Sequence, residues 1–176
     1  MRIRRTGLHK AAVKLVLEEG PKKVLDYGCG DGRVCRMIGK KQISATGVDI
    51  DRKAIKKAWG RKNGGYEWYR VDDISRPGCF KGEGDMDVVV CLDVLEHIND
   101  FGEALKNIHM AAPVAVISVP NEPWFEIFSR LKGTGRVKSG HVNFWKRDEF
   151  KKELGIWYEK VEVWPGLVWN LYRVRK

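Results

Sequence analysis

The sequence predicts a single α/β domain, residues 1–176, built on a mostly parallel sheet. Apolar runs of strand length alternate with segments of helical periodicity along the chain. The run at 86–92 is apolar apart from Asp87 near its start, which is typical of a strand buried on both faces of a parallel sheet. A turn with three glycines at 28–32 directly follows the first predicted strand. The length suits one domain, and 43% hydrophobic residues exclude a disordered chain.

The first half of the chain alternates helix and strand from residue 8 onward. Residues 8–19 have apolar side chains at helical spacing, and Gly20 and Pro21 end this helix. Asp51 is placed to cap a later helix. In chain order, the elements predicted for this half are helix 8–19, strand 24–27, helix 33–41, strand 45–50, helix 52–59 and strand 66–71.

The second half continues the alternation, with one long interruption at 121–145. Residues 75–85 are rich in turn formers and leave little room for a crossover helix. Pro165 and Gly166 separate two final strands, which we expect to form a hairpin. The elements predicted for this half are strand 86–92, helix 101–110, strand 114–119, helix 146–154 and strands 157–164 and 167–174.

Several protein classes are excluded by what the sequence lacks. No apolar run approaches the roughly 18–20 residues of a membrane span, and no apolar segment follows the basic start as in a secretory signal. We therefore expect a cytoplasmic protein. The four cysteines form no C-x-x-C pair, so four reduced thiols are expected rather than a zinc cluster or disulfides.

The net charge of +10 is unevenly distributed. Residues 1–14 carry +5, residues 130–152 carry +6 and the last four carry +3, so the remainder of the chain is mildly acidic. Such basic segments can attract nucleic acid or an anionic substrate, or simply form a solvated surface. The sequence leaves this choice open, and RNA remains a candidate partner.

The acidic groups around the glycine turn indicate the charge of its ligand. Asp49 follows Gly28 by 21 residues, at the end of the second predicted strand, where a carboxylate can accept both hydroxyls of a ribose. Arg33 stands where a dinucleotide fingerprint would have its third glycine. Asp26 and Asp31 would repel a pyrophosphate. A cationic nucleoside without phosphate, such as S-adenosylmethionine, fits better than a dinucleotide.

At this point the chain resembles a known family. The segment V-L-D-Y-G-C-G-D-G at 24–32 is similar to the first motif of class I S-adenosylmethionine-dependent methyltransferases. Residues 47–50, 73–74 and 87–97 fall where later motifs of that family occur, and 118–121 ends the strand expected fifth. The resemblance implies a three-layer Rossmann-like fold, with a seven-stranded sheet in which only the last strand is antiparallel.

The resemblance also implies a set of cofactor contacts. Asp26 would hold the methionine ammonium, Asp49 the ribose and Asp73 the adenine amino group, with Asp72 as a competitor for the last role. S-adenosylhomocysteine would be the product. The implied cofactor-binding residues are Asp26, Gly28, Gly30, Asp49, Ile50, Asp73, Ile74, Leu92 and Asp93.

Four residues form a second candidate constellation. Asp93, Glu96 and His97 have the spacing of one helical face, and His141 lies in the late interruption. Together they resemble the E-x-x-E-H and distant histidine that bind a divalent metal in small-RNA 2′-O-methyltransferases. However, Val-Leu-Glu-His also occurs in family members without a known metal. We expect no metal, with His97 and His141 as candidate catalytic bases.

The sequence indicates the methyl acceptor less specifically than it indicates the cofactor. The segment 121–145 has an amphipathic aromatic pattern and is interpreted as a substrate cap, whose aromatic residues either close over the acceptor or pack a helix onto the sheet. No (Asn/Asp)-Pro-Pro-(Tyr/Phe) motif follows the fourth strand, which argues against methylation of base nitrogens. We expect a small-molecule acceptor, with oxygen favoured over nitrogen. The alternatives are a metal-assisted RNA 2′-O-methyltransferase, a non-catalytic cofactor-binding protein and, more distantly, a dinucleotide oxidoreductase.

Overall fold

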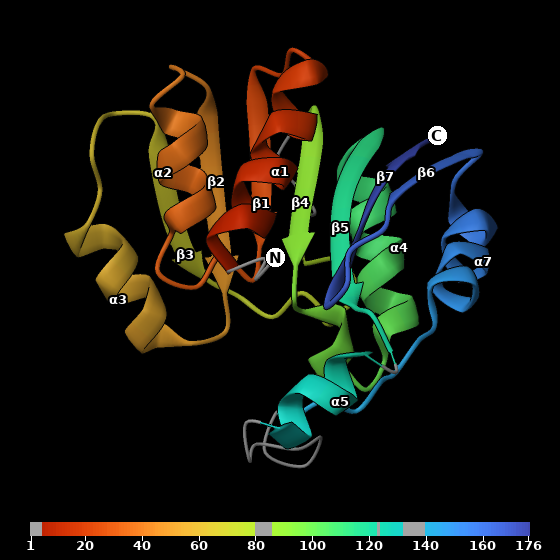
Figure 1. Ribbon diagram of the computed structural model, residues 1–176. Coiled ribbons are helices and arrows are strands. Elements are labelled where there is room, and N and C mark those ends of the chain that lie inside the picture. The colour runs from red at the N-terminus through yellow and green to blue at the C-terminus, as the bar shows by residue number, and fades with distance from the viewer. Residues whose placement is uncertain (1–4, 80–85, 123, 132–139) are drawn as a thin grey trace.

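The computed structural model describes residues 5–79, 86–122, 124–131 and 140–176 (Figure 1). Strands and helices alternate through most of this part of the chain. The strands are β1 (Lys23–Tyr27), β2 (Ser44–Asp49), β3 (Glu67–Val71), β4 (Val88–Leu92), β5 (Val114–Pro120), β6 (Lys160–Trp164) and β7 (Trp169–Arg175). The helices are α1 (Arg5–Glu18), α2 (Arg33–Gly39), α3 (Arg52–Gly60), the 3₁₀ turn η1 (Leu95–His97), α4 (Phe101–Ala111), α5 (Trp124–Leu131) and α7 (Arg147–Trp157).

The seven strands form one sheet in the order β3-β2-β1-β4-β5-β7-β6. Strands β1 to β5 pair in parallel, whereas β7 runs antiparallel to both of its neighbours, β5 and β6. The strand order reverses beside β1, where β2 and β4 flank it on either side. The predicted sheet, with only its last strand antiparallel, is therefore confirmed.

Both faces of the sheet are covered, which explains the apolar composition of its central strands. All five residues of β4 are buried, and its side chains alternate between two separate cores. Val89 packs with the core beneath α4 and α7, while Val90 packs with the core beneath α1, α2 and α3. This arrangement is the expected three-layer sandwich (Figure 1).

Local sequence explains where several elements begin and end. The carboxylate of Asp51 accepts a hydrogen bond from the amide of Lys53 at 2.8 Å and so caps α3 as predicted. The final hairpin differs from expectation at its start. Helix α7 continues to Trp157, whose ring packs 6.0 Å from that of His109, so β6 begins only at Lys160.

Three further sequence-based expectations can be compared with the structure. Residues 75–79 contain no helix, and the rest of that predicted turn-rich segment, 80–85, lies outside the described residues. All four cysteines are free and buried. Among the described helices, none combines the length and apolar character that a membrane crossing requires.

Candidate functional site

A cavity of about 900 Å³ opens at the carboxyl ends of the central strands. It lies beside β1, where the strand order reverses, which is the usual ligand site of an open α/β sheet. Its volume suits a cofactor-sized molecule. All nine residues of the cofactor set named above line this cavity: Asp26, Gly28, Gly30, Asp49, Ile50, Asp73, Ile74, Leu92 and Asp93.

Backbone geometry explains two glycines of the turn after β1. Gly28 has φ of +68°, and a Cβ there would lie 2.2 Å from Cγ2 of Val94, so this glycine permits close packing against the loop after β4. Gly30 has φ of +54°, but a Cβ there would meet nothing within 4 Å. The first glycine is therefore needed for packing, and the second leaves the backbone open toward the cavity.

The carboxylate of Asp49 is held in place by the glycine turn and by the start of α3. One oxygen accepts from the amide of Gly30 at 2.8 Å and the other from the amide of Asp51 at 2.8 Å. Each carboxylate oxygen has a second acceptor site, so Asp49 can also accept from a pair of neighbouring hydroxyls. This geometry fits a ribose.

Asp26 is a buried acid at the end of β1, with 3% of its surface exposed. Its carboxylate accepts a weak hydrogen bond from the Sγ of Cys35 at 3.4 Å. Burial, together with the nearby negative charge of Asp49, raises the pKa of Asp26 to about 7. Two carboxylates at one end of the cavity would be stabilised by a cation, so the residues present fit the ammonium of S-adenosylmethionine.

Two neighbouring aspartates after β3 differ in the partners of their carboxylates. Asp72 forms ion pairs with Arg70 at 3.6 Å and Arg76 at 2.9 Å. Asp73 instead uses its Oδ1 to accept from the amide and hydroxyl of Ser75, at 2.9 and 2.7 Å. The paired charge of Asp72 leaves Asp73 as the better acceptor for an adenine amino group.

The structure corrects the expectation that Asp93 shares a helical face with Glu96 and His97. Asp93 has φ of +57°, in the left-handed region, and the helical turn η1 begins only at Leu95. The Ser118 hydroxyl donates to the Asp93 carboxylate at 3.0 Å and accepts from its amide at 3.1 Å. This pairing across the ends of β4 and β5 holds the strained backbone and directs Asp93 away from the predicted quartet.

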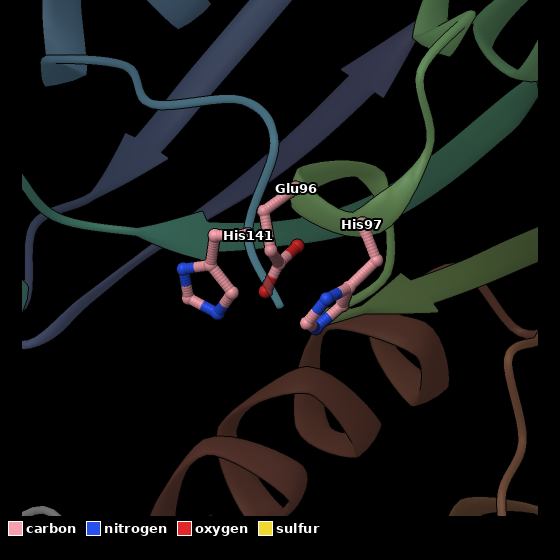
Figure 2. Close-up of side chains that lie close together, drawn as sticks. All are labelled: Glu96, His97 and His141. Atoms are coloured by element: carbon pink, nitrogen blue, oxygen red, sulfur yellow. The ribbon is translucent and has the colours of Figure 1, made fainter. Parts of the chain in front are cut away.

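The other three residues of that quartet do meet. Figure 2 shows the carboxylate of Glu96 between the imidazoles of His97 and His141. One donor atom from each residue lies within 4.8 Å of the others. Glu96 is 1% exposed, whereas His97 is exposed and lines the cavity. This set of two imidazoles and one carboxylate is chemically suited to a divalent transition metal.

A short segment anchored to η1 brings His141 to this position. The amides of Val142 and Asn143 donate to the carbonyl of Glu96, at 2.8 and 3.1 Å. The Asn143 side chain donates to the carbonyls of Leu95 and Ile98, at 3.1 and 2.6 Å. Asn143 was not identified from the sequence, because no local pattern reveals an anchor to a turn 45 residues or more away.

The two imidazoles have different environments. The Nδ1 of His97 donates to the carbonyl of Gly140 at 3.0 Å, which leaves its Nε2 as an acceptor. Burial, together with the adjacent His97, lowers the pKa of His141 to about 4, so His141 is neutral at pH 7. Phe125 of α5 stacks on the His141 ring at 4.6 Å.

One cavity residue, His9 of α1, was also missed by sequence reasoning. It lies in an amphipathic helix whose pattern is explained by packing alone, so nothing in the sequence marks it as a site residue. With Arg33 and His97, it supplies the basic groups of a cavity otherwise rich in aspartate. It is therefore suited to face an anionic group of a ligand, such as a carboxylate.

Comparison with known proteins agrees with this geometry. A family model described as a methyltransferase domain matches residues 2–155. The ubiquinone biosynthesis O-methyltransferase of Thiobacillus denitrificans is 33% identical in an alignment of 84 residues that covers 45% of this chain and 34% of the relative. The chain thus spans about a third of the length of the curated relatives that it matches.

Solved structures show the same fold at low identity. Magnesium protoporphyrin IX methyltransferase from Synechocystis PCC 6803, with bound S-adenosylhomocysteine, has a TM-score of 0.74 at 19% identity, over 98% of this chain and 85% of that one. The small RNA methyltransferase HEN1 has a TM-score of 0.78 at 18% identity, over 98% of this chain and 25% of that one. Because the family model covers most of the sequence, the chain belongs to the methyltransferase domain family and is a class I S-adenosylmethionine-dependent methyltransferase.

Proposed function

We propose that the protein transfers the methyl group of S-adenosylmethionine to a hydroxyl oxygen of a small aromatic molecule. The observation that carries this proposal is the position of His97, which lines the cofactor cavity with its Nε2 free to accept a proton. A hydroxyl must lose its proton as it attacks the methyl carbon, and a neutral imidazole is suited to take it. The matching O-methyltransferases of ubiquinone biosynthesis support oxygen as the acceptor atom.

The cofactor would be held by the acids and glycines at the strand ends. Asp26 binds the ammonium, Asp49 the ribose and Asp73 the adenine amino group. The glycine turn allows backbone to approach the methionine portion, and Leu92 and Asp93 line that side of the cavity. When bound, S-adenosylmethionine supplies a methyl group on a sulfonium. Ile74 and the exposed side chain of Ile50 line the cavity and would contact the adenine ring.

The aromatic residues near His97 suit a planar acceptor. Phe125 stacks on His141, and the Phe144 ring lies 6.3 Å from the same imidazole. These residues belong to the described parts of the predicted cap, 124–131 and 140–145, to which we assign the wall over the acceptor; residues 123 and 132–139 of that cap lie outside the described residues. An aromatic ring packed there would point its hydroxyl toward His97 and away from bulk water.

The acceptor atom can be identified with a matched set of small acids. Methyl transfer from radiolabelled S-adenosylmethionine is measured with a dihydroxybenzoate, the corresponding diaminobenzoate and unsubstituted benzoate. We expect label on the dihydroxy compound alone, and a loss of about a hundredfold in kcat with His97→Gln. Label on the amine or carboxylate contradicts the proposal. If none of the acceptors is methylated faster than in the absence of enzyme, the non-catalytic alternative is supported.

A second candidate function rests on the donor set of Glu96, His97 and His141. These three residues could hold a divalent metal, which would lower the pKa of an acceptor hydroxyl or orient two neighbouring oxygens. The lowered pKa of His141 keeps it in the neutral form that binds metals. This chemistry would suit a ribose 2′-hydroxyl of RNA as acceptor.

The two candidates are separated by metal titration. If the protein is a metal-assisted RNA methyltransferase, manganese or zinc raises its melting temperature and stimulates methyl transfer to RNA. RNA that already carries a 2′-O-methyl group at the target position then receives no labelled methyl group. Glu96→Gln abolishes the stabilisation by metal. If the protein is a metal-independent methyltransferase of small molecules, neither its melting temperature nor its turnover of the dihydroxy acceptor responds to metal or to chelator.

A further inference from the structure

A second hollow, distinct from the cofactor cavity, lies between α2 and the residues that follow α3. Its volume is about 380 Å³. Of the eight described residues that line it, five are cations and none is acidic: Arg33, Arg36, Met37, Lys40, Gly60, Arg61, Lys62 and Asn63. We call this hollow the basic groove. Converging positive charges cost free energy unless an anion neutralises them, so the groove is suited to an anionic ligand.

The protein supplies only part of that neutralisation. Asp31, at the rim of the groove, pairs with Arg61 and lies 3.8 Å from Arg36. Within the described part of the chain, no salt bridge is found for Arg33, Lys40 or Lys62. The surrounding sequence adds to the excess of positive charge, because residues 33–62 contain ten lysines and arginines and only two aspartates.

Exposed aromatic rings lie beside the groove, on α3 and the edge strand β3. Trp59 is 43% exposed and Trp68 is 55% exposed, and their rings meet edge to face at 6.2 Å. The indole nitrogen of Trp59 donates to the carbonyl of Tyr69 at 3.0 Å, which fixes that ring. Nζ of Lys62 lies 5.2 Å from the Trp59 ring and 4.4 Å from the Trp68 ring. A cation of the groove therefore also contacts both rings.

We propose that this surface binds single-stranded RNA, with phosphates in the basic groove and bases stacked on Trp59 and Trp68. Cations that follow a backbone, next to aromatic platforms that stack bases, are the usual elements of single-strand recognition. A duplex would hide its bases from the rings. A membrane would require apolar side chains that project freely, whereas Trp59 is hydrogen bonded to the protein.

The surface is close to the cofactor cavity, and His97, which we assign to the acceptor, is not among the described residues that line the groove. Arg33 lines both hollows, so an RNA in the groove passes beside the cavity entrance. Strand β3, which carries Trp68, is one edge of the sheet, and β6 with the neighbouring α7 lies at the other edge (Figure 1). Binding at this surface therefore goes beyond the proposed function and does not depend on which acceptor is methylated.

The binding test uses fluorescence anisotropy of a labelled 15-nucleotide single-stranded RNA with the full chain. If about four phosphates are neutralised, the slope of log affinity against log salt is about −3, which is a loss of roughly fiftyfold from 50 to 200 mM salt. The double variant Lys40→Ala/Lys62→Ala should halve that slope. Trp68→Ala should weaken binding about tenfold and leave the slope unchanged.

A matched control removes the same charge from the opposite edge of the sheet. Lys151→Ala/Lys152→Ala changes two exposed lysines of α7 and should alter RNA affinity less than twofold. Lys40, Lys62 and Trp68 do not line the cofactor cavity, so unchanged calorimetric binding of S-adenosylhomocysteine shows that their variants are folded.

Several results would overturn the proposal. These are absence of binding at 50 mM salt, equal losses in the α7 control, and no effect of Trp68→Ala. Equal affinity for an RNA duplex of the same length would show that the surface attracts polyanions in general and does not recognise single strands. Competition by phosphatidylserine vesicles as strong as that by unlabelled RNA would assign the surface to membranes instead.

Discussion

Ionisation of Asp26 should make the affinity for the cofactor depend on pH near neutrality. Asp26 is almost fully buried, and burial together with Asp49 raises its pKa to about 7. An ammonium placed beside this carboxylate stabilises its charged form and lowers the pKa in the complex. Cofactor binding should therefore release a proton from Asp26 at neutral and mildly acidic pH.

The size of the effect follows from the pKa of the unliganded protein. If only the ionised form binds well, affinity is reduced by the fraction of molecules with Asp26 protonated. Affinity should then fall about tenfold from about pH 8 to about pH 6, and about half a proton should be released per binding event at about pH 7. Affinity rises with pH because the cation favours the deprotonated acid.

Titration calorimetry with S-adenosylhomocysteine, in buffers of different ionisation enthalpy, measures both quantities. Asp26→Asn keeps an acceptor for the Cys35 thiol but cannot ionise, so its affinity should be flat over this pH range. The nucleoside 5′-methylthioadenosine, which lacks the amino-acid end, should show no dependence in the native protein. A pH dependence retained in Asp26→Asn would refute the reasoning and point to another group, such as His9.

Three further predictions concern stability and positioning. Gly28→Ala should cost about 1–3 kcal/mol more than Gly30→Ala in chemical denaturation, because only the first places a Cβ against Val94; equal costs would contradict the packing role. Asn143→Ala should lower the free energy of unfolding by about 1–3 kcal/mol and reduce methyl transfer by releasing His141, whereas unchanged turnover would show that this anchor is dispensable. Hydrogen bonds from Arg173 and Arg175 lower the pKa of Glu162 to about 2, so the stability that this carboxylate contributes above its ordinary pKa is lost as pH falls from about 5 to about 2. Arg173→Met should reduce that acid-induced loss by about 1 kcal/mol, and an identical pH profile would exclude the linkage.

The sheet and the cofactor cradle could be predicted because their determinants are local. A buried strand, a glycine turn and an acid at the next strand end each occupy a few consecutive residues. The alternation of β4 side chains between two cores follows from strand periodicity alone. The nine residues named from the sequence consequently line a common cavity, although their individual contacts with the cofactor stay predictions.

Features that depend on distant pairings could not be predicted. The left-handed backbone of Asp93 is held by Ser118, 25 residues later in the chain, so helical spacing was misleading there. The contact of His97 with His141 depends on the anchor at Asn143. The basic groove was overlooked because the excess of cations in residues 33–62 is outweighed by acids elsewhere when charge is summed over the body of the chain.

Asp31 lies between the two hollows and provides a test of both assignments in one variant. It lines the cofactor cavity, yet its carboxylate pairs with Arg61 and lies near Arg36, which line the basic groove. Asp31→Asn removes a negative charge that attracts the cationic cofactor and frees two arginines for phosphate. We therefore expect weaker binding of S-adenosylmethionine, RNA binding strengthened severalfold and a salt slope steeper by about 0.7. A change of the same sign for both ligands would show that Asp31 supports the local fold rather than dividing two sites of opposite charge.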